Sequence, residues 1–292
     1  MLSIRRASAI FCILLCACSK PSGSAAAGIE SIPSRICSVN LAADEMLAEL
    51  VSVERMAAVN VYVDDPGLSN AAGKYPAHIP RVRAELERVL TLNPDLVCVN
   101  PYNTADFLDY LQKSGRPVFR YDEVTSIAGI QQYLRELGKR VGAADKAEQM
   151  ARDMDRRLDA VAAALKNITK KPRIYYWAAS WTAGSNTTIH EIIERAGAVN
   201  AGAENARSGM YEMPLEDLFV LNPDILLLDA RDSLSALPGR DLPAQLQKLR
   251  AVKDGRVVFV AGKSLTTLSH FIVDGVEALA RELHPECFAI NK

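Results

Sequence analysis

The chain has 292 residues, of which 49% are hydrophobic and 24% charged, an ordinary composition for one or two globular domains. Lysine and arginine number 34 against 35 aspartates and glutamates, which gives a formal net charge of −1 at pH 7. Because the basic residues form no cluster, nucleic acid is not an expected partner.

The first 17 residues have the features of a cleaved signal peptide. Arg5 and Arg6 precede an apolar stretch, residues 9–17, that is too short to span a bilayer as a helix. No later segment reaches the roughly 18 continuous apolar residues that a transmembrane helix needs. Residues 1–17 are therefore expected to lie outside the fold, and no membrane span is expected after them.

The residues around Cys18 resemble a bacterial lipobox. Leu15 stands at position −3, Ala17 at −1 and Cys18 at +1. The resemblance implies cleavage before Cys18 and a lipid on its thiol, with an ordinary signal peptide as the alternative. Residues 18–32 are rich in small and polar side chains, which favours a lipid anchor followed by a flexible tether.

Residues 33–143 are predicted to form an α/β lobe, because short apolar runs alternate with helical patterns. Residues 64–83 interrupt this alternation with Gly and Pro, and are interpreted as a long loop. The predicted strands are residues 35–39, 56–63, 96–99 and 117–121, and the predicted helices are 42–50, a segment ending at Asn93, 105–114 and 127–141.

Residues 144–168 are predicted to form one long helix that bridges two lobes. The stretch lacks Gly and Pro and is rich in strong helix formers. Its apolar residues recur at helical spacing, with charges on the other side. A helix of about 25 residues spans roughly 37 Å, about the width of a small domain.

Residues 169–292 repeat the alternation and are predicted to form a second α/β lobe. Thr188 and Glu191 have the spacing of a capping box, which predicts a helix over residues 189–196. The predicted strands are residues 173–178, 225–228 and 256–260, the other helices are a segment ending at Asn222, 243–249 and 272–283, and the loops are 180–187, 201–213, 231–242 and 261–271. Such alternation predicts mostly parallel sheets, whose ligands bind outside the carboxyl ends of the strands.

The two predicted lobes share a phrase. Residues 86–95 read LERVLTLNPD and residues 215–224 read LEDLFVLNPD, with six identities in ten positions and an apolar run after each. Proline forces its predecessor out of the helical region, so the helices are expected to end at Asn93 and Asn222. A common helix–strand junction used twice is the plain alternative to two related lobes.

Three cysteines lie in the predicted lobes: Cys37, Cys98 and Cys287. An odd number leaves at least one thiol free or paired between chains. Cys37 and Cys98 both fall in apolar strands, so buried and inert thiols are favoured, with a bridge between them as the alternative. Cys-x-x-Cys and Cys/His zinc spacings are absent from the sequence.

The order of these features resembles a solute-binding protein of an ABC importer. The phrases LERVLTLNPDLV, AGSNTTIHEIIERAGAVN, PLEDLFVLNPDILLL, KDGRVVFV and VDGVEALARELHPE occur in sequence, and the resemblance extends over residues 33–288. It points to the cluster that handles cobalamin, ferric siderophores and haem. It implies two lobes bridged by one rigid helix, with a metal chelate clamped between them.

The same resemblance implies the partners and the location. A permease and an ATPase would receive the chelate, and the protein would be a monomer at the periplasmic or cell-envelope face, in contact with the membrane through its lipid only. Glu87 and Glu216, equivalent in the repeated phrase, would dock into arginine pockets of the permease. The plain alternative is that both are solvated helix-surface carboxylates.

The candidate ligand-binding residues are aromatic, basic or imidazole side chains in the loops that follow the strands. Flat rings suit a broad apolar chelate, and a guanidinium suits anionic groups. Each residue alone is as consistent with ordinary packing, and Trp181 is the best single candidate, because a Trp in a polar loop has little core to enter. The candidates are Tyr62, Tyr102, Trp181, Arg207, Tyr211 and His270, with Asp64, Arg83, Asn103, Tyr121, Trp177 and Phe271 in the wider set.

Other ligand and function classes are less favoured. The chain has four histidines and no His-rich loop, whereas a free-metal site usually needs three or four His or carboxylate ligands, so no metal site is expected. Haem coordinated by His270 or a Tyr, and a sensor lipoprotein without transport, stay open as alternatives. An enzyme is not expected, because the phosphate-loop, nucleophile-elbow and H-E-x-x-H motifs are all absent from the sequence, and no cofactor is called for.

Overall fold

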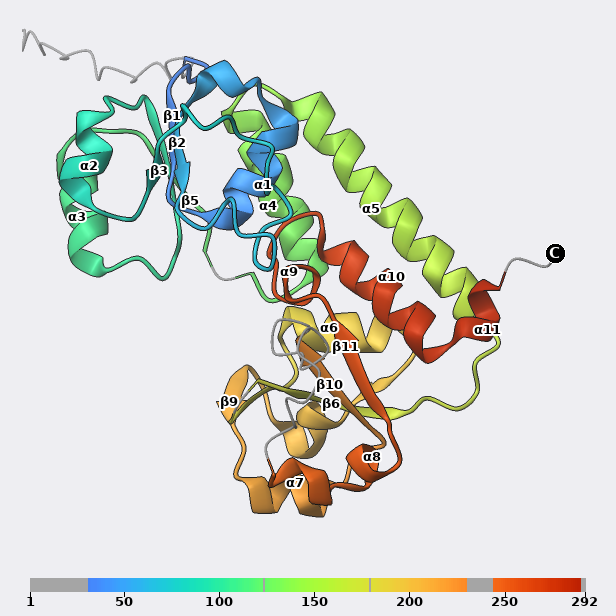
Figure 1. The fold of residues 1–292 in the computed structure, drawn as a ribbon. Helices are drawn as coiled ribbons and strands as arrows, with labels where there is room; N and C mark the ends of the chain where they lie inside the picture. Colours follow the sequence, from blue (N-terminus) through green and yellow to red (C-terminus); the bar gives the residue numbers. More distant parts are fainter. Residues whose placement is uncertain (1–30, 123, 179, 230–243, 290–292) are drawn as a thin grey trace, which may run out of the picture. The chain divides into compact units, whose positions relative to one another are not determined.

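The computed structural model describes residues 31–122, 124–178, 180–229 and 244–289, and Ile32–Lys292 belong to one compact unit. The predicted signal peptide, Cys18 and the predicted loop 231–242 lie outside the described residues. Within the described residues, no helix is both long enough and apolar enough to cross a bilayer. Figure 1 shows the fold that was expected, with two α/β lobes joined through one long helix.

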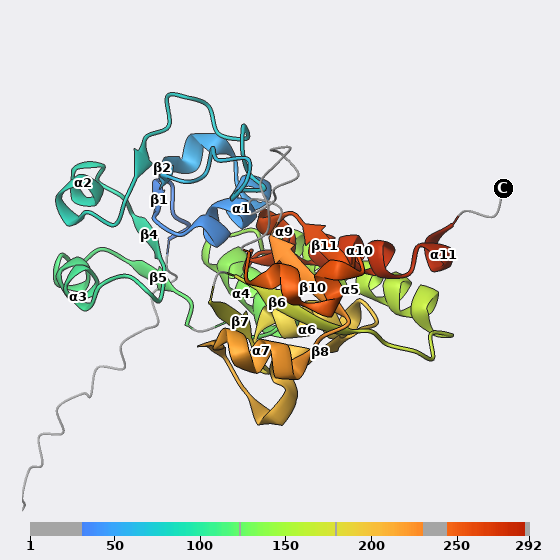
Figure 2. The same cartoon turned by 60° about the horizontal axis from the view of Figure 1, so that its bottom comes forward.

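The first lobe is built on a five-stranded parallel sheet in the order β3-β2-β1-β4-β5. Helices α1 and α4 pack on one face and α2 and α3 on the other, as Figure 2 shows. The strands are β1 (Ile36–Ser38), β2 (Met56–Asn60), β3 (Arg81–Val82), β4 (Leu96–Val99) and β5 (Val118–Arg120), and the helices are α1 (Leu41–Leu50), α2 (Leu86–Thr91), α3 (Ala105–Lys113) and α4 (Ile127–Arg140), with a 3-10 turn η1 (Val53–Arg55).

The second lobe contains a four-stranded parallel sheet in the order β11-β10-β6-β8 and a short antiparallel ribbon of β7 and β9. Helices α6 and α10 pack on one face of the sheet, and α7 on the other. The strands are β6 (Arg173–Trp177), β7 (Trp181–Ala183), β8 (Val199–Asn200), β9 (Met210–Glu212), β10 (Ile225–Asp229) and β11 (Val257–Val260); the helices are α6 (Thr188–Arg195), η2 (Ala201–Ala206), α7 (Leu215–Leu221), η4 (Leu246–Lys248), α8 (Arg250–Lys253), α9 (Gly262–Leu265), α10 (Ile272–Leu283) and α11 (Pro285–Phe288).

The long helix α5 (Ala144–Leu165) begins at the predicted residue and ends three residues earlier than predicted. It packs along α4 of the first lobe and α10 of the second. Its buried stripe joins the cores of both lobes into one apolar cluster. The guanidinium of Arg157 adds hydrogen bonds to the carboxylates of Asp274 (2.6 Å) and Glu277 (2.9 and 2.8 Å) on α10. The bridging helix is therefore held along its length and not only at its ends. Its buried residues are Ala147, Ala151, Met154, Leu158, Val161 and Leu165.

The repeated phrase produces the same left-handed turn in both lobes. Asn93 and Asn222 each adopt a left-handed backbone conformation, with φ of 47° and 44°. Asparagine tolerates this region better than most residues because its short side chain can bond locally. Helix α7 stops at Leu221 with Asn222 as its C-cap, as predicted, whereas α2 stops at Thr91, two residues before the predicted end at Asn93.

The aspartate of that phrase fastens the following strand to the first strand of its lobe. The carboxylate of Asp95 accepts a hydrogen bond from the Arg35 amide (2.8 Å), and that of Asp224 accepts one from the Arg173 amide (3.0 Å). In return the Asp95 and Asp224 amides donate to the carbonyls of Arg35 and Arg173. The guanidinium of Arg35 donates to carbonyl groups at the end of α2, and that of Arg173 donates to carbonyl groups at the end of α7. The two lobes thus share the same clamp at this helix–strand junction.

Several local predictions were wrong because the residues had partners that the sequence pattern does not show. Helix α6 is capped by the Thr187 hydroxyl, which accepts from the His190 amide, and not by Thr188. The predicted strand 56–63 ends at Asn60. In the described part of the predicted helix 243–249, only Leu246–Lys248 is helical, as the 3-10 turn η4, because Leu249 has an extended backbone (ψ 142°) and α8 begins after it. The predicted loops contain the short elements β3, β7, β9, η2 and α9.

Cys37 and Cys98 are free and lie on opposite faces of the first sheet. In the parallel register, Cys37 pairs with Val97 and Ser38 with Cys98, so the two cysteines are one residue out of step. A shift of one residue turns a side chain to the other face. The alternative of a Cys37–Cys98 bridge is therefore ruled out by the direction of the side chains.

Asp44, on α1, is a completely buried carboxyl group in the first lobe. One oxygen accepts a hydrogen bond from the Asn60 amide (2.8 Å), while Oδ1 has no partner within the described residues. Burial raises the pKa of Asp44 well above its usual value of 3.8. The native state thus binds this proton more tightly than the unfolded chain, and the free energy of unfolding falls as pH rises above about 3.9.

We expect Asp44→Asn to stabilise the protein at pH 7 and to have little effect below pH 4. The side-chain oxygen of the new asparagine still accepts the hydrogen bond from the Asn60 amide. The substitution also removes the cost of ionising a buried carboxyl, which is about 1.4 kcal/mol for each unit by which the native pKa exceeds the unfolded pKa. Urea unfolding at pH 7 and at pH 3.5 measures the difference. An equal change in the free energy of unfolding at both pH values would contradict the prediction.

Candidate functional site

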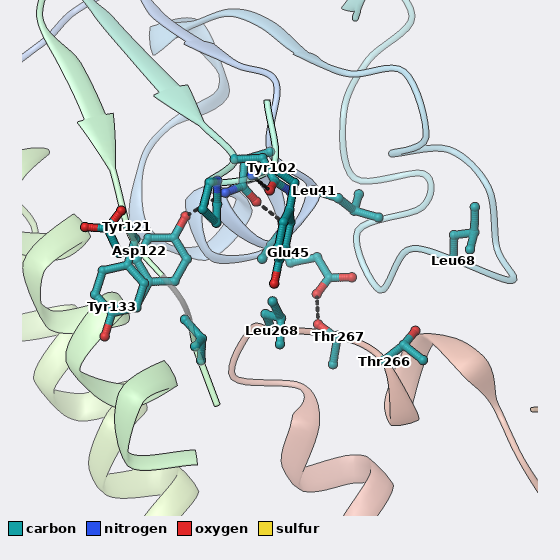
Figure 3. Close-up of a pocket in the computed structure, with 15 residues that line it drawn as sticks. Leu41, Glu45, Leu68, Tyr102, Tyr121, Asp122, Tyr133, Thr266, Thr267 and Leu268 are labelled. Carbon is teal, nitrogen blue, oxygen red and sulfur yellow. Dashed lines mark hydrogen bonds between the residues drawn. The ribbon is translucent and has the colours of Figure 1, made fainter. Parts of the chain in front are cut away.

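A pocket opens at the carboxyl ends of β4 and β5, where the first lobe meets a loop of the second (Figure 3). Its volume is about 180 Å³. The first lobe contributes the start of α1, the residues that follow β4 and β5, and Tyr133 of α4. The second lobe contributes Thr266–Leu268, between α9 and α10. This is the position at which parallel α/β sheets bind ligands.

Stacked aromatic rings form one wall of the pocket. The Tyr121 and Tyr133 rings are nearly parallel, with centroids 4.3 Å apart, and Phe119 stacks on Tyr133 at 5.6 Å. Burial raises the pKa of both tyrosines, so their phenols are neutral at physiological pH. The Tyr121 hydroxyl donates to the carbonyl of Gly129 (2.5 Å). The wall is rigid, apolar and uncharged.

Asn40 closes the pocket beside this wall and also starts α1. Its side-chain oxygen accepts hydrogen bonds from the amides of Ala42 (3.0 Å) and Ala43 (3.2 Å), which makes it the N-cap. Its amide group donates to the carbonyl of Val99 (3.1 Å). These bonds fix Asn40 as part of the pocket's frame.

The charges that line the pocket are acidic. They belong to Glu45 and Asp122, and no lysine or arginine is among the described lining residues. Glu45 is 1% exposed and fully hydrogen bonded. Asp122 forms an ion pair with Arg120 at 2.9 Å. The described lining residues therefore offer rings, amides, hydroxyls and carboxylates, and none of them is a cation that would hold an anionic group.

Of the six candidate ligand-binding residues, the structure places Tyr102 in this pocket. Tyr102 follows β4 and is 75% exposed, so its ring is free to meet a ligand at the pocket mouth. Tyr62 lies outside the pocket lining and contacts Arg83 instead. The Arg83 guanidinium lies 5.5 Å from the centre of the Tyr62 ring and donates a hydrogen bond to its phenol oxygen (3.2 Å). Tyr121, from the wider set, also lines the pocket.

Trp181, Tyr211 and Arg207 gather on the ribbon of the second lobe and not in the pocket lining. Trp181 follows the carboxyl end of β6 and is 44% exposed. The Tyr211 hydroxyl donates to the Gly202 carbonyl (2.6 Å), and the Arg207 guanidinium lies 5.2 Å from the Tyr211 ring centre. In the antiparallel register Trp181 pairs with Glu212 and Tyr211 with Thr182, so the Trp181 ring lies on the face of the ribbon opposite to that of Tyr211 and its neighbour Arg207.

His270 lies in a different depression, beside α5 and Glu49. Burial lowers the pKa of His270 to about 4, and its Nδ1 atom has no hydrogen-bond partner within the described residues. Its ring packs on Phe271, with centroids 4.1 Å apart. The described residues contain no group of three or more His, Cys, Asp or Glu arranged to hold a metal ion. His270 is thus placed apart from the pocket to which it was assigned.

Glu87 and Glu216 occupy equivalent places, each in the first turn of its helix, α2 or α7. Both are exposed, and neither carboxylate has a hydrogen bond or ion pair within the described residues. Each helix packs on the same relative face of its own sheet. The geometry leaves both carboxylates accessible to a partner.

Sequence reasoning missed several pocket residues. Asn40 and Asn100 directly follow strands, so the rule for parallel sheets would have selected them. Glu45 lies inside a regular helix and gives no signal of its own, because its partners are far away in sequence. Thr266–Leu268 fell within a predicted loop but contain no aromatic or charged side chain.

The fold and the pocket together define a two-lobed binding protein with a cleft between parallel sheets. A model of the periplasmic binding protein family matches residues 36–262, and the chain belongs to this family. It is a substrate-binding protein of the kind that serves ABC importers, which work with a permease and an ATPase.

Individual relatives agree with this assignment. The chain is 26% identical over 235 residues to YvrC of Bacillus subtilis, an uncharacterized ABC transporter substrate-binding lipoprotein, covering 73% of this chain and 71% of the relative. It is 27% identical over 289 residues to a cobalamin-binding protein of Halobacterium salinarum, covering 92% and 75%. Its fold is similar to that of the periplasmic heme-binding protein RhuT from Roseiflexus, with a TM-score of 0.73, 20% identity and coverage of 87% and 99%.

We expect His270→Leu to weaken the acid sensitivity of the protein. A histidine with a native pKa of about 4 and an unfolded pKa of 6.5 costs stability as pH falls below 6.5, because the unfolded chain takes up the proton first. The wild type should lose about 3 kcal/mol more than the variant between pH 7 and pH 4. Denaturant unfolding at the two pH values measures this, and parallel losses in both proteins would refute it.

Proposed function

We propose that this chain is a lipid-anchored binding protein that captures an uncharged, amide-bearing metal chelate of the cobalamin class and delivers it to an ABC permease. The carrying observation is the interlobe pocket, whose aromatic and amide lining contains no basic side chain among its described residues. The lipobox-like residues at Cys18 support an anchor on the outer side of the membrane.

The charge of the pocket separates the candidate chelates. Haem carries propionates and catecholate siderophores are anionic, and both need guanidinium or ammonium partners. A corrin ring carries neutral amides, which hydroxyl and amide groups such as those of Thr266 and Asn100 recognise by hydrogen bonds. The cobalamin-binding relative is consistent with this choice. A ferric siderophore with neutral hydroxamate groups is the second candidate, for the same electrostatic reason.

The size of the pocket indicates that such a chelate extends beyond it. Pockets for drug-sized ligands measure about 300–1,000 Å³, whereas this one measures about 180 Å³. Tyr102 at the pocket mouth belongs to the first lobe and Trp181 on β7 to the second, and both rings are exposed. We propose that the two rings bear on opposite sides of the chelate.

The first test is a titration of the protein from residue 18 onward, with Cys18→Ser to remove the lipid. Saturable quenching of Trp fluorescence by cobalamin, and not by haem, is the expected result. Quenching by haem alone would overturn the charge argument, and quenching by a ferric hydroxamate would select the second candidate. No response to any chelate would overturn the proposed ligand class.

We expect Tyr102→Ala and Trp181→Ala each to weaken chelate binding about tenfold, because each removes one stacking contact of about 1.4 kcal/mol. Trp177 stays as the fluorescent probe in both variants. Tyr110→Ala is the matched control, since Tyr110 is an exposed tyrosine of α3 outside the pocket lining. Equal weakening by the control would show that stacking at Tyr102 and Trp181 is not the cause.

Docking to the permease is proposed to use Glu87 and Glu216. We expect the double variant Glu87→Ala, Glu216→Ala to keep its chelate affinity and to lose uptake in cells, because each carboxylate would pair with a permease arginine. A control double variant, Glu54→Ala with Glu282→Ala, removes one exposed carboxylate from each lobe at other places. Normal uptake by the first double variant would reject the docking role.

A further inference from the structure

The carboxylate of Glu45 joins the two lobes at the pocket (Figure 3). Glu45 belongs to α1 of the first lobe, and its Oε1 accepts from the amide (2.7 Å) and side chain (3.1 Å) of Asn70 in the same lobe. Its Oε2 accepts from the hydroxyls of Thr267 (2.6 Å) and Ser269, which follow α9 in the second lobe. Asn70 in turn donates to the carbonyl of Lys263 (2.8 Å) on α9.

Glu191 makes the reverse contact, from the second lobe to the first. It lies in the first turn of α6, and its Oε2 accepts from the amide of Ile127 at 2.5 Å. Ile127 is the first residue of α4, where helical amides lack partners and the helix dipole favours a negative charge. The other oxygen of Glu191 is held by Arg195 (3.0 and 3.1 Å). Each lobe thus presents one carboxylate to donors of the other.

Neighbouring glutamates of the same helices behave differently. Glu49, one turn after Glu45 on α1, bonds Lys74 within the first lobe. Glu194, on α6 beside Glu191, accepts from the Asn200 amide (3.2 Å) within the second lobe. The interlobe contacts therefore belong to particular positions and do not follow from a general excess of acidic residues on these helices.

We infer that Glu45 and Glu191 are positioning residues that together form a reciprocal latch and set the width of the cleft. The lobes stay attached through the apolar core of α5, so the latch controls their separation at the pocket and not their association. Breaking either contact leaves donors without partners, which costs free energy. Because both contacts join the same two lobes, a change in the separation of the lobes affects both, and the two contacts should open together.

The latch gives a reason for the small pocket. At the closed width the pocket holds about 180 Å³, too little for a whole chelate of the proposed class. Binding then requires the latch to open, and the apparent affinity is reduced by the fraction of molecules that are open. This step rests on the proposed function, whereas the latch itself does not.

Amide hydrogen exchange tests the latch without any ligand. Glu191→Ala is expected to speed exchange at the Asn70 amide, and Glu45→Ala to speed exchange at the Ile127 amide, each at least fivefold, although neither substitution touches the amide measured. Glu49→Ala and Glu194→Ala are the matched controls and should leave both amides unchanged. Faster exchange only at the amide that lost its own acceptor would overturn the latch.

A second variant guards against loss of folding at the buried site. If Glu45→Ala does not fold, Glu45→Gln replaces it, because glutamine keeps the size of the side chain and removes the charge. Exchange at the Asn70 amide in the Glu191→Ala variant is measured independently of either Glu45 variant. Stopped-flow binding of cobalamin then gives the functional arm, with association at least threefold faster in the Glu191→Ala variant. Failure of cobalamin to bind at all would reject the proposed ligand and leave the exchange result standing, whereas unchanged association would reject the gating role.

Discussion

The structure depends on one continuous apolar seam between α5 and the helices of both lobes. Met154, Leu158 and Val161 of α5 are buried in the same cluster that contains residues of α4, α6 and α10. Each such side chain contributes about 1.5–3 kcal/mol when it is fully buried. Because this seam is shared, the lobes cannot separate along α5 without exposing core, and freedom of movement is confined to the region farther from the bridging helix, where the pocket lies.

Polar contacts act within the limits that this seam sets. The paired clamps at Asp95 and Asp224 fasten the strands inside each lobe, so each sheet moves as a unit. Of the two interlobe carboxylates, Glu45 lines the pocket, and Glu191 joins the lobes at the start of α4. The molecule thus combines rigid lobes with a cleft whose width is set by hydrogen bonds, and these are easier to exchange for ligand contacts than a packed core is.

The sequence was sufficient for the fold because helix patterns, strand runs and the repeated Leu-Asn-Pro-Asp phrase are local signals. The long helix, both parallel sheets and the left-handed turns at Asn93 and Asn222 follow from them. Short elements such as β7 and β9 were missed, because a three-residue ribbon is stabilised by pairing between residues about 30 apart, and no local pattern records it.

The pocket was less predictable than the fold. Tyr102 was identified because it follows a strand, whereas His270 also follows a strand and a short helix yet packs beside α5. Which loop residue turns toward the cleft depends on packing after the chain has turned. Glu45 was beyond reach for the same reason, since its donors at Thr267 and Ser269 come from the other lobe.

The one-residue offset between Cys37 and Cys98 affects how the two thiols would react with oxidants. Each thiol is sealed in a separate core, and burial raises the pKa of Cys37 to about 12 and raises that of Cys98 as well. Oxidants and disulfide exchange act on the thiolate, which is then almost absent at neutral pH. Burial in the folded first lobe thus protects both cysteines, and their oxidation is favoured only while the chain is unfolded.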